Sequence, residues 1–154
     1  MHDQMPPPLR PADWVDPSRV TVIEGDILWE TGYEAGYTDV GAEREQRLAE
    51  ALQHRPWRDV VREEFEQRSP WLHQIITHPS RARMLDVLDL PEGGNYLDVG
   101  SGWGQLSIPL GRRGHVCALD QTAGRLRILR QIARQEQVAL LLHCGGIATY
   151  PFRE

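Results

Sequence analysis

A glycine-rich segment that follows a short apolar run constrains the fold of this 154-residue chain most strongly. Residues 95–99 read Asn-Tyr-Leu-Asp-Val, which is typical of a buried strand, and residues 100–104 read Gly-Ser-Gly-Trp-Gly. Glycine at every second position lets a strand turn sharply into a helix and lets the backbone come close to a ligand. The pattern D-x-G-x-G-x-G therefore predicts a strand–turn–helix unit with a ligand site at the turn.

Strand and helix patterns alternate after this turn. We predict a helix over residues 103–112, a strand over 115–119, a helix over 122–137 and a strand over 138–143. The strand segments are apolar throughout, without a polar residue at every second position, which is typical of parallel strands covered on both faces. The sequence therefore predicts an α/β fold with a parallel sheet.

The chain before residue 93 has a different character. Residues 1–19 contain five prolines and are expected to form a loosely held leader. Two β-prone runs around Glu24-Gly25-Asp26 indicate a hairpin or an extended arm, and residues 32–41 form a loop with no assigned chemistry. We expect three regions: a flexible leader with a short hairpin and loop (1–41), a helical N-terminal region (42–92), and the strand–helix region (93–154).

Apolar spacing predicts four amphipathic helices between residues 42 and 90. Ser69-Pro70 is typical of a helix start, because serine caps the N-terminus and proline suits the first helical position. The residues expected to face the core include Leu48, Ala49, Leu52, Trp57, Trp71, Ala82, Leu85 and Leu88.

Charge and composition exclude several kinds of function. The net charge is −5, which argues against a surface built to neutralise nucleic-acid phosphates. All 17 basic residues are arginine, so no Schiff-base or P-loop lysine is available. No signal peptide and no apolar run near the ~20 residues of a membrane helix is visible, so we expect a cytoplasmic protein. Cys117 and Cys144 are expected to be buried free thiols, and no metal site is expected.

Two carboxylates accompany the glycine turn. Asp98 lies at the end of the first predicted strand, and Asp120 ends the second, 20 residues after Gly100. In a βαβ unit a carboxylate at that spacing accepts hydrogen bonds from the ribose hydroxyls of a bound nucleotide. The dinucleotide fingerprint G-x-G-x-x-G would require glycine at position 105, where this chain has Gln105, and this disfavours a nicotinamide cofactor.

Residues 95–152 resemble the first half of a class I S-adenosylmethionine-dependent methyltransferase. Leu97–Gly104 resembles the glycine-rich motif of that family, and Asp120 resembles its acidic strand end. Residues 145–152 resemble the stretch after its third strand, although Gly146 stands where the family has an acid facing the adenine amino group. The resemblance implies a Rossmann-like parallel sheet whose first three strands have the order 3-2-1, with S-adenosyl-L-methionine as the cofactor.

The resemblance also implies roles for individual residues. The three glycines of the turn would contact the methionine part of the cofactor, and Asp98 would lie near its amino group. Asp120 would hold the ribose and Gln121 would lie beside the adenine. The cofactor-binding residues implied are Asp98, Gly100, Ser101, Gly102, Trp103, Gly104, Asp120, Gln121, Gly146 and Ile147. No catalytic residue is assigned.

The family fold has seven strands in the order 3-2-1-4-5-7-6, whereas only three of them are expected here. We therefore expect a truncated core, whose activity alone is uncertain, with residues 95–99 as an exposed edge that self-association or a partner chain would cover. The methyl acceptor is unidentified; residues 71–81 resemble members linked to saccharide or cell-surface biosynthesis. Two other interpretations stay open: a non-catalytic cofactor-binding or partner-binding module, and a fragment of an NAD-linked oxidoreductase.

Overall fold

The computed structural model describes residues 14–23, 26–34, 38 and 40–147. Most of the expected leader and residues 148–152 of the stretch after the third strand lie outside these described ranges. Within the described ranges, every helix is too short or too polar to cross a bilayer.

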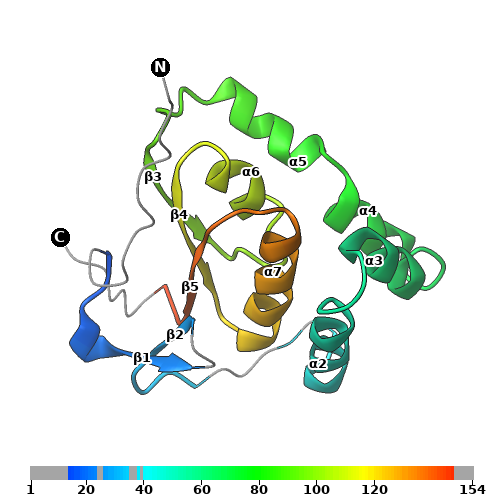
Figure 1. The fold of residues 1–154 in the computed structure, drawn as a ribbon, viewed down its shortest axis with the longest axis horizontal. Helices are drawn as coiled ribbons and strands as arrows, with labels where there is room; N and C mark the ends of the chain where they lie inside the picture. Colours follow the sequence, from blue (N-terminus) through cyan, green and yellow to red (C-terminus); the bar gives the residue numbers. More distant parts are fainter. Residues whose placement is uncertain (1–13, 24–25, 35–37, 39, 148–154) are drawn as a thin grey trace.

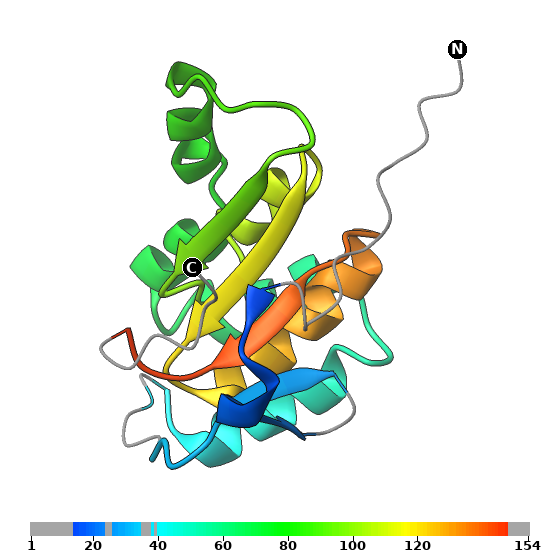
Figure 2. The same ribbon diagram turned by 90° about the vertical axis from the view of Figure 1, so that its left-hand side faces the viewer.

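Three parallel strands form the centre of the fold: β3 (Asn95–Val99), β4 (His115–Asp120) and β5 (Leu141–Cys144). β4 lies between the other two, with Val99 opposite Leu119 on one side and Asp120 opposite Cys144 on the other. Figure 2 shows the three strands side by side in green, yellow and orange. The predicted α/β fold and the strand order 3-2-1 are confirmed, and the arrangement is Rossmann-like.

Two further strands join the sheet beyond β5. β1 (Val20–Ile23) pairs antiparallel with β2 (Ile27–Glu30), and β2 runs parallel to β5 with Leu28 opposite His143. Within the described residues the order is β1-β2-β5-β4-β3, so the sheet has five strands there where only three were expected. The hairpin joins because Ile27 and Leu28 are buried against the core. It extends the sheet on the side away from β3 and leaves the β3 edge unchanged.

Two helices connect the parallel strands and lie next to one face of the sheet (Figure 1). α6 (Ser107–Gly111) follows β3, and α7 (Ala123–Gln135) follows β4. The prediction that the first of these helices starts at residue 103 is wrong. Gly102 and Gly104 have φ values of +55° and +94°, and a helix cannot continue through such positions.

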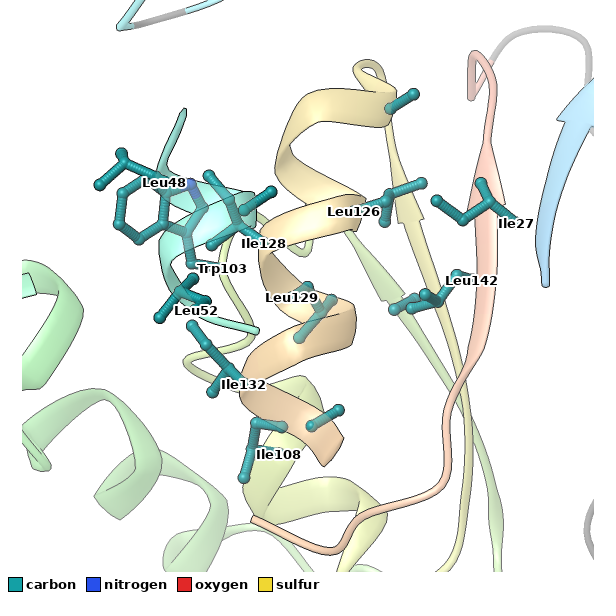
Figure 3. Packing of buried hydrophobic residues seen from close by; sticks show 14 of the residues in the cluster. Ile27, Leu48, Leu52, Trp103, Ile108, Leu126, Ile128, Leu129, Ile132 and Leu142 are labelled. Atoms are coloured by element: carbon teal, nitrogen blue, oxygen red, sulfur yellow. The ribbon is translucent and has the colours of Figure 1, made fainter. Parts of the chain in front are cut away.

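The first two helices of the N-terminal region form a second layer on α7, and the third packs on the second of them. The helices of this region are α2 (Ala42–Ala51), α3 (Trp57–Phe65), α4 (Pro70–Thr77) and α5 (Ser80–Arg83). The described residues also contain the 3-10 turns η1 (Pro17–Arg19) and η2 (Met84–Val87). Figure 3 shows Leu48 and Leu52 beside Trp103 on one side of α7, while Leu126 faces the sheet on the other. Burying each such leucine contributes about 1.5–3 kcal/mol. The apolar faces predicted for α2 and α3 are therefore confirmed.

Hydrogen bonds at the end of α7 hold this layer in place. The Gln135 side chain accepts from the main-chain N–H of Trp57 at 2.7 Å and donates to the carbonyl oxygen of Leu52 at 2.8 Å. The neighbouring Glu136 carboxylate accepts from the Trp57 indole at 2.6 Å and from Arg112. The helical region is therefore fixed to the same helix that follows the candidate acid Asp120.

The predicted burial is wrong at two residues of this region. Trp71 is 61% exposed and Leu88 is 48% exposed, whereas Leu85 is buried as expected. α4 has no buried residue, and the segment from Ser80 onward changes from a single α-helical turn to a 3-10 turn. Leu88 follows the end of the 3-10 turn with extended backbone (φ −95°, ψ 134°), so it lies outside the helical turn that places Leu85 against the core.

Candidate functional site

The carboxyl ends of four parallel strands meet at one edge of the sheet. β3, β4, β5 and β2 all run in the same direction, so Asp98, Asp120, Cys144 and Glu30 lie at or next to their ends on this edge. Open α/β sheets bind their ligands at this edge. The candidate site is therefore defined by the topology before any side chain is considered.

The glycine turn is pinned over the end of β4. The main-chain N–H groups of Gly100 and Ser101 donate to the carbonyl oxygen of Leu119 at 2.9 and 3.0 Å. Gly100, Gly102 and Gly104 all have positive φ, which side chains rarely tolerate. A Cβ at Gly100 would meet no atom within 4 Å, so open space adjoins the turn there.

Asp120 links its strand to the turn. One carboxylate oxygen accepts from the main-chain N–H of Gly102 at 2.9 Å, and the other accepts from that of Thr122 at 3.1 Å. Arg125 forms an ion pair with the same carboxylate at 3.5 Å. The Asp120 side chain is 1% exposed, so the carboxylate faces into the protein.

Asp98 is also turned inward. It is buried, and one of its carboxylate oxygens accepts from the hydroxyl of Ser107 at 2.5 Å, which ties β3 to the first residue of α6. Burial raises the pKa of Asp98 above its ordinary value; hydrogen bonds from Ser107 oppose this shift, and the charge of Asp120 adds to it. A cationic group placed beside Asp98 would offset the cost of its buried charge.

Ser101 and Trp103 occupy the turn in different ways. Ser101 is 3% exposed, and its hydroxyl has no hydrogen-bond partner within the described part of the chain. The ring of Trp103 lies in the core, edge-on to Phe65 with 5.4 Å between ring centroids. Figure 3 shows this ring among the residues that pack outside α7. The Trp103 ring therefore lies on the core side of the turn, and its main chain borders the turn.

The remaining predicted residues lie where β4 and β5 end. The carbonyl oxygen of Gln121 accepts from the Cys144 thiol at 3.6 Å, and the Gln121 side chain is exposed. The main-chain N–H of Gly146 donates to Glu30 at 3.1 Å, and Ile147 is 64% exposed. These residues share the edge with the glycine turn and with Asp120.

Sequence analysis missed Glu30 and Tyr33, which the hairpin brings to this edge. Glu30 is 4% exposed. The main-chain N–H of Tyr33 donates to the carbonyl oxygen of Glu30 at 3.1 Å, so Tyr33 lies next to the end of β2. Burial raises the pKa of the Tyr33 hydroxyl, and electrostatic interactions with Cys144, Asp120 and Glu30 add to this shift. Glu30 follows the apolar run 27–29 as Asp120 follows its own strand. An acidic residue at the end of an apolar strand is therefore the signal that would have identified Glu30, once the hairpin was placed in the sheet.

A hollow of about 160 Å³ lies behind the turn, between α4–α5 and α6–α7. Trp57, Ile76 and Pro79 line it from the N-terminal helices, and Gly104 and Gln105 line it from the turn. Neither Asp98 nor Asp120 lines it. In the described residues, histidine, cysteine, aspartate and glutamate side chains form no group of three that could hold a metal ion.

Comparison with known proteins gives little further information. No family model matches the chain, and no curated protein matches it. Among solved structures, the chain is similar to phosphoethanolamine N-methyltransferase 1 of Haemonchus contortus, in complex with phosphoethanolamine and S-adenosylhomocysteine, at 14% identity and a TM-score of 0.43. The similarity covers 75% of this chain and 23% of that chain, so this chain corresponds to about a quarter of that protein. A likeness of this size carries neither the fold nor the function.

Proposed function

We propose that the chain binds S-adenosyl-L-methionine at the carboxyl edge of its sheet and forms the cofactor-binding part of a methyltransferase. The observation that carries the proposal is the hydrogen bond from the N–H of Gly102 to Asp120. It places a glycine turn with open backbone directly beside a strand-end carboxylate. A nucleoside with a charged amino-acid tail needs this combination of close backbone approach and two acidic groups.

The residues of the glycine turn suit the methionine part of S-adenosyl-L-methionine. The space next to Gly100 admits a ligand atom where a Cβ would stand. The buried hydroxyl of Ser101 can donate to a carboxylate, and a buried hydroxyl without a partner costs about 1–3 kcal/mol, which a ligand would recover. Asp98, whose buried charge is unfavourable by itself, suits an ammonium group.

The Asp120 carboxylate has the chemistry to bind ribose hydroxyls, but its side chain is almost fully buried. A carboxylate has about four lone-pair sites, and the two main-chain N–H groups use one on each oxygen. The Thr122 hydroxyl and Arg125, each 3.5 Å from Oδ1, also contact that oxygen, so capacity remains on Oδ2 for one hydroxyl donor. Because the side chain is 1% exposed, the sugar reaches it only when the flanking turn shifts slightly.

The sulfonium of S-adenosyl-L-methionine supplies a methyl group that is already activated. The protein then mainly has to hold the cofactor and keep an acceptor nucleophile in line with it at about 3 Å. The turn, Asp98 and Asp120 account for the first of these tasks. The acceptor and the residues that hold it are not assigned.

Calorimetric titration of the full chain with S-adenosylhomocysteine and with NAD tests the proposal. We expect S-adenosylhomocysteine to bind and NAD to bind far more weakly. Asp120→Asn should weaken binding by about tenfold or more, because a charge-assisted hydrogen bond is worth about 1.5–3 kcal/mol. Asp86→Asn, which changes an exposed carboxylate paired with Arg113, is the matched control. Preferential binding of NAD would contradict the proposal, as would an Asp120→Asn variant that binds like the native chain.

The open edge of β3 favours a second candidate, a module that binds a partner chain. Within the described residues β3 pairs with β4 alone, and Val99 at its end is 46% exposed. An apolar parallel strand at the edge of a sheet is a ready template for another strand. Sedimentation analysis tests this candidate, since a monomer at high concentration, with no partner bound, would argue against it.

A further inference from the structure

The side chain of Glu30 occupies an unusual position for a carboxylate. Trp29 pairs with Cys144, so Glu30 follows at the level of Gly145 on the neighbouring strand. The residue is 4% exposed, whereas glutamate is almost never fully buried unless it is paired. One carboxylate oxygen accepts from the N–H of Gly146 at 3.1 Å.

The other oxygen of this carboxylate has no partner in the described part of the chain. No arginine forms an ion pair with Glu30 among the described residues, and its Oε1 accepts no hydrogen bond there. His143 lies close by and is fully buried. A carboxylate in this state has free capacity for one more donor, and a ligand N–H would supply it.

Glycine at position 145 lets the main chain pack directly against Glu30 and His143. A Cβ at Gly145 would lie 2.5 Å from the Glu30 carboxylate and 2.9 Å from Nε2 of His143, so only glycine fits there. Gly146 follows and donates its N–H to Glu30. The chain after β5 therefore carries no side chain at residues 145 and 146, which follow the strand between the ends of β4 and β2.

The spacing of the two strand-end carboxylates matches a nucleoside. β5 lies between β4, which ends at Asp120, and β2, which ends at Glu30. Two strand spacings separate them, which is about 10 Å. That separation is close to the length of a nucleoside from its ribose hydroxyls to the far edge of its base.

We propose that Glu30 accepts a hydrogen bond from the amino group on the base of the bound nucleoside and so selects an amino-substituted base over an oxo-substituted one. This inference rests on the proposed function, because it places the ribose at Asp120. It gives the N-terminal hairpin a role in the site: β2 forms the wall against which the base edge lies. Tyr33, which follows β2, donates its main-chain N–H to the carbonyl oxygen of Glu30 at 3.1 Å.

Calorimetric titration of the full chain with S-adenosylhomocysteine and S-inosylhomocysteine tests the assignment, since the two differ in having an amino or an oxo group on the base. The native chain should prefer S-adenosylhomocysteine by about 10–100-fold, which corresponds to one hydrogen bond to a charged group. Glu30→Gln should reduce this preference to about threefold or less, because an amide can donate to the oxo group as well as accept from the amino group. Glu34→Gln, which changes an exposed glutamate four residues away, should leave the preference intact.

The outcomes separate this inference from the function on which it rests. If the native chain binds neither ligand, the proposed function itself is overturned, and the role of Glu30 with it. If it binds both ligands equally, or if folded Glu30→Gln keeps the full preference, only the assignment of Glu30 is overturned. Circular dichroism shows whether Glu30→Gln folds. If this variant does not fold, the preference of the native chain between the two ligands still tests the assignment of Glu30.

Discussion

Replacing Gly104 by alanine should destabilise the protein considerably more than the same change at Gly100. Both residues have positive φ, +94° and +73°, so an alanine at either position is strained by about 1–2 kcal/mol. Their surroundings differ. A Cβ at Gly104 would lie 2.3 Å from Cδ1 of Leu129 and 3.1 Å from Cγ1 of Ile108, whereas a Cβ at Gly100 would meet nothing within 4 Å.

The packing difference sets the expected magnitude. Leu129 and Ile108 are buried in the main core, and forcing a methyl group into such a core costs about 1–3 kcal/mol. Gly104→Ala should therefore lower the free energy of unfolding by about 2–5 kcal/mol in total. Gly100→Ala should lower it by about 1–2 kcal/mol. Total stabilities of small proteins are about 5–15 kcal/mol, so the first loss is readily measured.

Urea unfolding followed by circular dichroism at equal protein concentration measures both values. A double-mutant cycle of Gly104→Ala with Leu129→Ala identifies the contact, because truncating Leu129 removes the atom that the new methyl group meets. The two changes should be less harmful together than the sum of their separate effects, by about 0.5–3 kcal/mol. Equal losses at Gly100 and Gly104, or strict additivity in the cycle, would refute the reasoning.

Three further predictions concern titratable groups. Burial raises the pKa of the Cys117 and Cys144 thiols to about 12, so at pH 8 a thiol reagent should modify them only as the protein unfolds, and modification of the native protein at the rate of a free thiol would contradict this. Burial raises the pKa of Asp98 above its value in the unfolded chain, so the free energy of unfolding of the native protein falls as pH rises from the unfolded to the folded pKa of this group. Asp98→Asn has no such group, so its stability relative to the native chain should increase over that pH range, and urea unfolding at a series of pH values measures this difference. Glu136→Ala, which removes the acceptor of the Trp57 indole, should lower the free energy of unfolding by about 1–3 kcal/mol, and an unchanged melting temperature would show that this contact is dispensable.

The strand–turn–helix part of the fold could be predicted because its signals are local. The apolar runs of β4 and β5 and the alternating glycines from Gly100 onward each report on a short segment. The spacing between Gly100 and Asp120 also carried information on tertiary structure, since one βαβ unit has a narrow range of lengths. The contact between Gly102 and Asp120 follows from that unit.

The parts that could not be predicted depend on distant contacts or on details of the backbone. The pairing of β2 with β5 joins Leu28 to His143, and no local pattern in either segment indicates the other. As a result the sequence left Glu30 without a place in the site. The exposure of Trp71 was unpredictable for a similar reason, because amphipathic spacing does not show whether another element covers the apolar face.

The hydrogen bonds that hold the glycine turn affect the thermodynamics of binding. The N–H groups of Gly100, Ser101 and Gly102 are already satisfied by the end of β4, so the loop is formed before any small molecule arrives, and binding requires only the slight shift that exposes Asp120. Because the loop is preorganised in this way, it loses little conformational entropy when a ligand binds, and the affinity then depends on the contacts between the ligand and the protein. A preformed loop also predicts rapid association, because the rate is then limited by diffusion and orientation of the ligand and not by folding of the loop around it.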